Sequence, residues 1–298
     1  MAALPHLVQR RVDALAAAFF EAPGMARVDF SAPAGAAALF APDSISWRVM
    51  KNPVALMVGG IAAVILELAE PRVRAGVWEH TTFRRDPITR MKRTGYAAMV
   101  TVYAPATAAR AMIAQVVRAH DRVTGETAEG APYRANDREL LDWVQATATY
   151  GFCEAYRAFV APLSGTEADR LYAEGAAAAA LYGATGAPRS TLEMEALFAA
   201  MGPKLQRSEI VFEFLDIVRA AAILPSRSLQ KLMVRGAVEI TPAWAREALG
   251  LGKKFGLPTG GAQILRAIGA AAERVPILAA PPAQACVRMG LRRDYLYR

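Results

Sequence analysis

Apolar residues recur every three or four positions along most of this chain, the spacing that places them on one face of an α-helix. Strict alternation of apolar and polar residues, which is typical of strands, is scarce, and the helix-favouring residues Ala, Leu, Glu and Arg are abundant. The pattern predicts helices at 5–21, 53–69, 71–79, 87–104, 106–123, 137–161, 166–182, 190–201, 207–222, 226–236, 241–249 and 260–273.

Helix-breaking and helix-capping residues separate these segments. Asp86-Pro87 reads as an N-cap followed by proline at the first helical position, so it needs no catalytic role. Three further helix starts carry capping residues: Asn136-Asp137, Ser164/Thr166 and Ser190-Thr191. The segment TGETAEGAPYRA, near residues 124–135, is predicted to be a small hairpin or a loop.

The predicted fold is therefore an all-α globular multi-helix bundle with at most a minor hairpin near 124–135. The chain shows no internal repeat and no sustained heptads, and none of its segments has the composition of a flexible linker. We expect residues 1–42 to form an N-terminal helical extension and residues 43–298 to form one domain with a single core, since 298 residues is near the upper limit for one core.

The longest apolar run, residues 53–66, predicts a buried helix. Its length of about 14 residues is short of the roughly 20 that span a bilayer, so we expect no transmembrane span, while peripheral membrane contact stays open. Glu67 and Glu70 follow the run. We interpret them as the solvated end of this helix; a carboxylate pair is the alternative.

The composition of the chain argues against several functional classes. The net charge of +8 is scattered along the chain, and no zinc-finger, RNA-recognition or basic-zipper pattern accompanies it, so no nucleic-acid partner is expected. The N-terminus lacks the pattern of a secretory signal. Cys153 and Cys286 lie far apart, which predicts no disulfide framework and a cytoplasmic location. Nothing in the sequence indicates an oligomeric state.

His120, one of only three histidines, is the residue most suggestive of chemistry. It shares the apolar face of the helix predicted at 106–123 with Ala109, Ile113 and Val116. An ionisable ring that faces a core is costly unless it is hydrogen-bonded or bound to something. Two readings stay open: a core histidine bonded to a carbonyl group, and a ligand of a metal or haem.

A second candidate is the basic stretch from His80 to Thr94. Arg90 and Thr94 are four residues apart and share a helix face, with Arg93 beside them. A cation and a hydroxyl on one face can hold a carboxylate or a phosphate, although a solvated basic face is the simpler interpretation. His80 could act as a capping group, a second ligand or a proton carrier. Nucleotide loops, the HExxH motif and the GxSxG motif are absent.

The run ILELAEPRVRAGVWEHTTFRRDPITRMKRT, followed by AHDRVTG and GAPYRANDRELLDWVQAT, resembles the MpaB-type oxygenase family, to which the latex-clearing rubber oxygenases are distantly related. The resemblance covers roughly residues 45–250, including ILPSRSLQKL and AREALGLG near its end. Glycine, histidine, phenylalanine, Asp-Pro, the Arg/Thr pair and a second histidine follow one another with gaps similar to those of the family.

This resemblance implies an α-helical fold that holds haem b. It implies that His120 is the proximal iron ligand and that Arg90 and Thr94 form the distal catalytic pair. Arg90 and Arg93 are further cofactor-binding candidates, since arginines can pair with haem propionates, and His80, which matches the Glu-His position of the family pattern, is a third catalytic candidate. Two positions depart from the pattern. Arg93 stands where the relatives carry a distal lysine, and arginine cannot lose its proton to bind iron. Glu70-Pro71 stands where many members carry His-Pro.

The function implied by the resemblance is that of a haem b-dependent oxygenase that uses O2 and acts on an apolar organic substrate. Two alternatives stay open. One is a non-catalytic helical protein that binds haem or lipid. The other is a cofactor-free helical protein in which His120 is structural.

Overall fold

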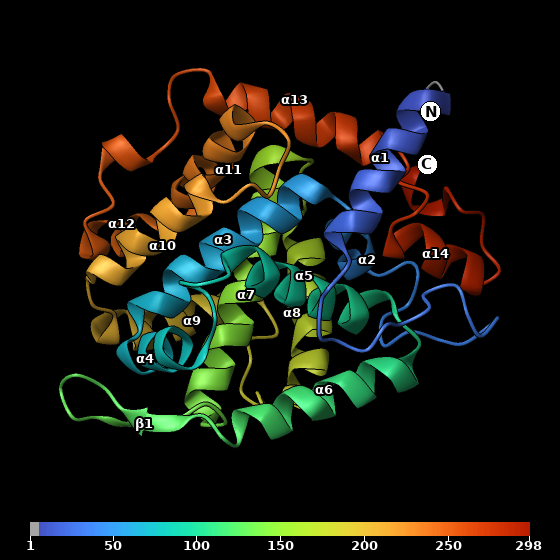
Figure 1. Ribbon diagram of the computed structural model, residues 1–298. Coiled ribbons are helices and arrows are strands. Elements are labelled where there is room, and N and C mark those ends of the chain that lie inside the picture. The colour runs from blue at the N-terminus through green and yellow to red at the C-terminus, as the bar shows by residue number, and fades with distance from the viewer. Residues whose placement is uncertain (1–5) are drawn as a thin grey trace.

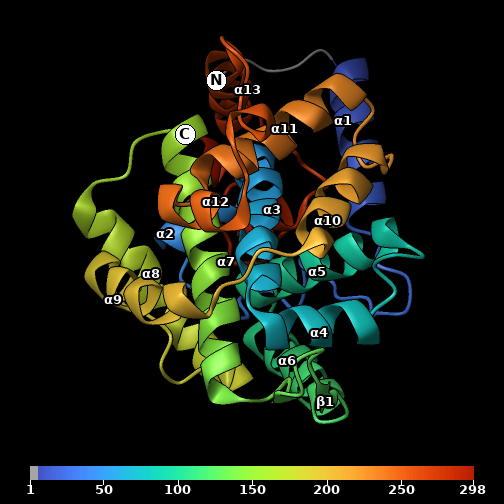
Figure 2. The same ribbon diagram turned by 90° about the vertical axis from the view of Figure 1, so that its left-hand side faces the viewer.

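The computed structural model describes residues 6–298, and this part of the chain is a bundle of fourteen α-helices with one two-stranded sheet (Figures 1 and 2). The helices are α1 (His6–Phe19), α2 (Ile45–Met50), α3 (Pro53–Ala69), α4 (Pro71–His80), α5 (Pro87–Tyr103), α6 (Ala106–His120), α7 (Arg138–Phe159), α8 (Gly165–Ala179), α9 (Thr191–Met201), α10 (Glu209–Ala220), α11 (Arg227–Ile240), α12 (Ala243–Leu249), α13 (Gly261–Arg274) and α14 (Pro281–Arg288). Strands β1 (Thr124–Glu126) and β2 (Pro132–Arg134) form an antiparallel hairpin, and short 3-10 helices cover Ala180–Tyr182, Gly202–Lys204, Lys253–Phe255 and Tyr295–Tyr297.

The structure confirms the prediction of an all-α bundle with a minor hairpin. The predicted caps are also observed: the side chains of Asp86, Asp137, Ser164 and Ser190 each accept a hydrogen bond from a backbone N–H at the start of their helix. Two helices were not predicted, α2 and α14. They contain 6 and 8 residues, which is too short for the period of 3.6 to show, and most of their side chains are buried.

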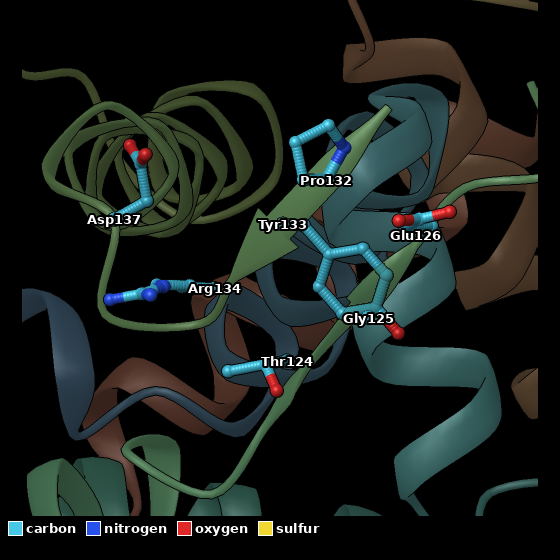
Figure 3. Close-up of a pocket in the computed structure, with 7 residues that line it drawn as sticks. All are labelled: Thr124, Gly125, Glu126, Pro132, Tyr133, Arg134 and Asp137. Carbon is cyan, nitrogen blue, oxygen red and sulfur yellow. The ribbon is translucent and has the colours of Figure 1, made fainter. Parts of the chain in front are cut away.

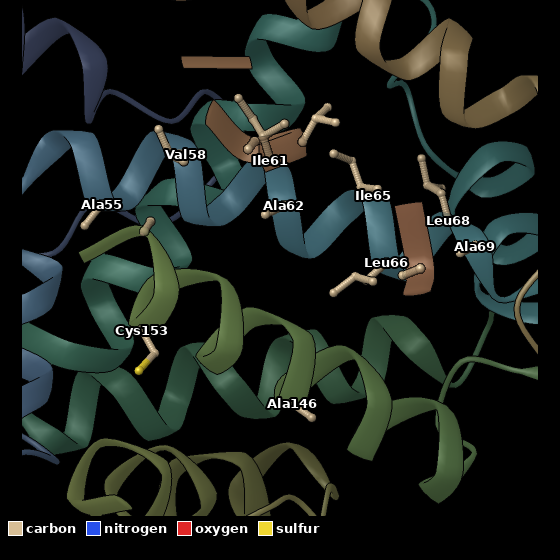
Figure 4. Packing of buried hydrophobic residues seen from close by; sticks show 14 of the residues in the cluster. Ala55, Val58, Ile61, Ala62, Ile65, Leu66, Leu68, Ala69, Ala146 and Cys153 are labelled. Carbon is tan, nitrogen blue, oxygen red and sulfur yellow. The ribbon is translucent and has the colours of Figure 1, made fainter. Parts of the chain in front are cut away.

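Helices α3 and α7 cross at the centre of the molecule with their backbones in contact (Figure 1). A Cβ atom added to Gly59 would lie 2.7 Å from the carbonyl oxygen of Gly151, and one added to Gly151 would lie 2.3 Å from that of Gly59. Either distance is well below van der Waals contact, so only glycine fits at both positions. The side chains of α3 are apolar on both sides of the helix: Leu66 points toward α7, whereas Ile61 and Ile65 point away from it (Figure 4).

The other helices cover this central pair. α10, α11 and α13 pack on α3 from one side, and α8 and α9 lie against α7 (Figure 2). α5 and α6 form a helical pair whose apolar residues join α2 in a second core cluster around Trp47 and Tyr103. Phe30 and Phe40 are also buried in this second cluster. The domain boundary at residue 42 stays a prediction.

Two buried cations fasten the C-terminal segment to the bundle. The guanidinium of Arg288, which is 1% exposed, donates to the carbonyl oxygens of Phe30, Ala36 and Tyr103 at 2.6–2.8 Å. The ammonium of Lys51 lies 2.8 Å from a carboxylate oxygen of Glu273 and 3.1 Å from the same residue's carbonyl oxygen. Because each cation has several acceptors, its burial is offset by hydrogen bonds.

Among the helices of residues 6–298, none is by itself long and apolar enough to span a membrane. The pair α3 and α4 passes the criterion of length and composition only when taken together, and the two helices meet at an angle of 110°.

The α3–α7 crossing predicts different effects for two glycines. Gly151→Ala should lower the free energy of unfolding by at least about 2 kcal/mol, because the new methyl group must push the two helices apart. Gly60→Ala is the matched control, since no atom lies within 4 Å of its added Cβ and alanine favours a helix by up to about 1 kcal/mol. Chemical denaturation followed by circular dichroism measures both. Equal stability of the two variants would contradict the backbone contact.

Candidate functional site

Polar side chains on or next to four helices interact with one another, and we call them the polar cluster. They share electrostatic or hydrogen-bonded contact with one another and surround the ends of α3 and α6. The members of the polar cluster are Glu67 on α3, Arg90 and Thr94 on α5, His120 on α6, Asn136 just before α7 and Thr147 on α7.

Arg90 and Thr94 form a hydrogen-bonded pair on α5. One terminal nitrogen of the Arg90 guanidinium donates to Thr94 Oγ1, and the Thr94 hydroxyl donates to the carbonyl oxygen of Arg90 at 3.1 Å. The pair therefore lies on one helix face, as their spacing predicts. Arg90 is half-buried while Thr94 is exposed. Burial is the main influence on the Arg90 guanidinium and lowers its pKa, with Glu67 opposing this effect.

His120 is the last residue of α6, three residues earlier than the predicted helix end, and its ring is half-buried. Nδ1 of the ring is buried and makes no hydrogen bond, and neither does the buried Oδ1 of Asn136. The Asn136 side chain is nonetheless the polar group that acts on the ring, and its influence raises the pKa of His120. The amide nitrogen of Asn136 is held at the end of α6 by Val117 O at 3.0 Å and by Asp121 Oδ1 at 2.6 Å.

The electrostatic environment favours the neutral form of His120. Burial lowers the pKa of the imidazole, and the nearby positive charge of Arg90 lowers it further. Asn136 and Asp121 act in the opposite direction but are the weaker influences. A neutral imidazole has a lone pair available for a metal, whereas a protonated one does not.

The interpretation of Glu67 and Glu70 as a solvated helix end was wrong for Glu70, which is buried, while Glu67 is half-buried. Glu70 is 2% exposed and caps α4: its carboxylate accepts from Val73 N at 2.8 Å and pairs with Arg72 at 2.8 Å. Glu67 points into the polar cluster instead. The 110° bend between α3 and α4 separates the two carboxylates, of which Glu70 is buried and Glu67 is half-buried.

Glu67 is the functional candidate that the sequence did not reveal. Burial raises the pKa of its carboxyl group to about 7, while the Arg90 guanidinium and a hydrogen bond with Thr147 act to lower it. The signal available in the sequence was that Glu67 is the only charged residue in the 17 residues of α3. The sequence contains no comparable signal for Thr147 or Asn136, the other two members of the polar cluster that were not predicted.

Arg93 and His80 have their described contacts elsewhere. Arg93 is exposed, and its Nε donates to the carbonyl oxygen of Pro23 at 2.7 Å. The exposed His80 lies at the end of α4, with its Nε2 3.1 Å from the hydroxyl of Tyr133. Tyr133 in turn donates to Glu79 at 3.2 Å, so His80 helps to hold the β1–β2 hairpin against α4.

An open surface groove lies along that hairpin (Figure 3). It runs beside Thr124, Tyr133, Arg134 and Asp137. None of the residues selected from the sequence as site candidates lines it. The polar cluster, which contains three of those candidates, remains the stronger site.

The donor set of the polar cluster fits haem better than a metal ion held by side chains alone. Among residues 6–298, no group of three or more His, Cys, Asp or Glu side chains could hold a metal ion. Haem iron brings its four ring nitrogens and needs one histidine from the protein. His120 is a half-buried imidazole whose surroundings favour the neutral form, which suits that role.

Comparison with known proteins gives one finding. The family model described as "ER-bound oxygenase mpaB/B'/Rubber oxygenase, catalytic domain" matches residues 47–274. This span includes every member of the polar cluster. No significant match was found among curated proteins or among solved structures.

The burial of Glu67 predicts how stability depends on pH. Its pKa of about 7 in the folded state exceeds the ordinary 4.5, so the folded state holds its proton more tightly and loses stability as the pH rises from 4.5 to 7. Glu67→Gln removes this ionisation. The variant should therefore gain stability relative to the natural protein across that window, by up to about 3 kcal/mol.

Urea denaturation at pH 5 and pH 8 measures this difference. Glu195→Gln on α9 is the control, because Glu195 is exposed and the substitution makes the same chemical change. A difference between Glu67→Gln and the natural protein that is the same at both pH values would show that Glu67 is not buried as described.

Proposed function

This chain belongs to the mpaB/B'/rubber oxygenase catalytic-domain family, and we propose that it is a haem b-dependent oxygenase that acts on an apolar organic substrate, with His120 as the iron ligand. Membership supports oxygenase activity in general, with O2 and a substrate as partners. The observation that supports the finer proposal is the environment of His120: the ring is half-buried, its neutral form is favoured, and its buried Nδ1 makes no well-aligned hydrogen bond.

In this proposal α6 carries the residue that would bind the iron, His120. The helix ends at His120, and the side-chain amide of Asn136 donates hydrogen bonds to Val117 O and Asp121 Oδ1 at that end. These bonds fix the backbone that carries the ring. A metal-bound histidine usually donates the N–H of its second ring nitrogen to an oxygen atom, which fixes the orientation of the ring. Asn136 Oδ1 is an acceptor of this kind. When bound, haem would supply the iron chemistry that activates O2.

Arg90 and Thr94 would act on what binds opposite His120. Their mutual hydrogen bond uses one guanidinium nitrogen and leaves the others able to donate. These donors can orient a polar oxygen atom, either of bound O2 or of a substrate group, in surroundings that are partly desolvated. Holding one orientation lowers the entropic part of the activation barrier.

His120→Ala should abolish or strongly weaken haem retention, because the iron would lose its only bond to the protein. The helical content should stay unchanged, because His120 is the last residue of α6 and alanine is a strong helix former. The measurement is the Soret absorption of the haemin-reconstituted and desalted protein, with circular dichroism as the test of folding.

His80→Ala is the matched control and should keep most of the haem, because His80 contacts Tyr133 on the hairpin. Loss of haem in His80→Ala with retention in His120→Ala would reverse the assignment. A natural protein with no Soret band would favour a cofactor-free protein with a structural His120. A haem protein that consumes no O2 with any apolar candidate, squalene among them, would favour a non-catalytic binding protein.

Thr94→Ala should keep the haem but lower substrate-dependent O2 consumption by about tenfold, which corresponds to one lost hydrogen bond of about 1.4 kcal/mol in the transition state. An oxygen electrode measures the rate. Thr107→Ala is the control, since this exposed threonine lies near the opposite end of α6 from His120. Equal rates for Thr94→Ala and Thr107→Ala would exclude Thr94 from the reaction.

A further inference from the structure

Residues 6–29, which we call the N-terminal flap, lie on the outside of the bundle. They comprise α1 and the extended segment after it, which passes beside α5 (Figure 1). α1 contacts the C-terminal segment through the side chains of Gln9 and Asp13. Among the flap residues whose exposure the structure describes, none is buried, whereas Phe30, the next residue, is 4% exposed. A surface segment with so few buried contacts opens at a lower cost in free energy than the core.

The chain that follows the flap is firmly fixed. The buried guanidinium of Arg288 donates to Phe30 O at 2.6 Å and to Ala36 O at 2.8 Å. Ala106 N, at the start of α6, donates to Ala37 O at 2.8 Å. Because these bonds begin at Phe30, the flap has its pivot at or just before this residue.

Arg93 of α5 holds the flap next to the polar cluster. Its Nε donates to Pro23 O at 2.7 Å, and a Cβ atom added to Gly24 would lie only 2.6 Å from its Nη2. Arg93 directly precedes Thr94, so this part of the flap is fastened beside the Arg90–Thr94 pair. The Arg93 side chain is exposed, and an exposed hydrogen bond exchanges readily with water, so it holds the flap closed only weakly.

The side of the flap that faces the bundle is apolar. Four of its residues pack, half-buried, against the second core cluster: Phe20, Ala22, Met25 and Val28. Tyr96 of α5 belongs to the same cluster, and its hydroxyl accepts from Val28 N at 2.7 Å and donates to Ala26 O at 3.2 Å, close to the pivot. Opening the flap at Arg93 therefore uncovers apolar surface beside the helix that carries Thr94.

We propose that the N-terminal flap opens at Arg93 and that an apolar substrate enters along the surface beneath it, toward Arg90 and Thr94. This inference rests on the proposed function, in which that pair faces the ligand. An apolar molecule replaces the apolar contacts that the closed flap makes, whereas a charged molecule loses hydration there without compensation. Arg93 is then a gating residue, which controls access to the site as the residues of active-site lids do.

Limited proteolysis of the haem-free protein tests the flap without a cofactor. Trypsin cleaves after the exposed Arg27, and the rate of this cleavage follows the population of the open flap. Arg93→Met removes the hydrogen-bond donor and should speed the cleavage on the order of fivefold. Gly24→Ala should act in the same direction, because its methyl group displaces the guanidinium. Gly35→Ala is the matched control: its φ of +77° resembles the +79° of Gly24, but no atom lies within 4 Å of its added Cβ.

Ligand binding to the haem-loaded ferric protein tests the route. The bulky apolar ligand 4-phenylimidazole should bind on the order of fivefold faster to Arg93→Met and Gly24→Ala than to Gly35→Ala or the natural protein. Imidazole, which is small and neutral at pH 8, should bind all four proteins at similar rates. Stopped-flow absorption in the Soret region measures both ligands.

Unchanged cleavage after Arg27 in both variants would overturn the inference, with or without haem. Faster cleavage with unchanged binding of 4-phenylimidazole would also overturn it and leave the proposed function standing, since the flap would then open away from the site. Faster cleavage throughout the chain would show general destabilisation and count against a gate. A natural protein without a Soret band would end the proposed function and the entry route together, while the proteolysis would still decide whether Arg93 holds the flap.

Discussion

The backbone contact between α3 and α7 is the constraint on which the rest of the structure depends. Gly59 and Gly151 let two long helices cross without side chains between them. From this crossing the helices run in opposite directions, which brings Glu67 of α3 to Thr147 of α7 and lets the indole of Trp143 donate to Leu66 O at 3.2 Å. One close approach therefore places the carboxylate of the polar cluster.

The polar cluster is the second consequence of this geometry. α5 and α6 pack beside the central pair, so Arg90 and His120 enter the same region from their own helices. Each of them influences the ionisation of its neighbours, because these side chains are partly withdrawn from water. The same desolvation keeps His120 neutral and makes Glu67 hard to ionise, so ligand availability at His120 and the charge of the site have a common physical cause.

Much of the fold follows from the sequence alone. Helix positions are visible because a helix that packs on one side must repeat its apolar residues every three to four positions, and helix starts are visible because Asp86, Asp137, Ser164 and Ser190 satisfy backbone N–H groups locally. The Arg90–Thr94 pair belongs to the same category, since the spacing of four along one helix is enough to bring them together. The family, too, was recognisable from ordered motifs.

Contacts between distant segments were decided only by the tertiary structure. Periodicity shows that a residue faces inward but not which group it meets, so the partners of His120 and Glu67 were not predictable, and the buried Glu70 was misread as solvated. For the same reason Arg93 and His80 looked like neighbours of Arg90 in sequence, yet Arg93 reaches Pro23 and His80 reaches Tyr133. Local spacing along the chain determined the helices and their faces. The tertiary structure decided which of those faces share a site, through the crossing of α3 and α7 and the packing of α5 and α6 against them. The formation of a shared site depends on close approach between residues that are far apart in the chain.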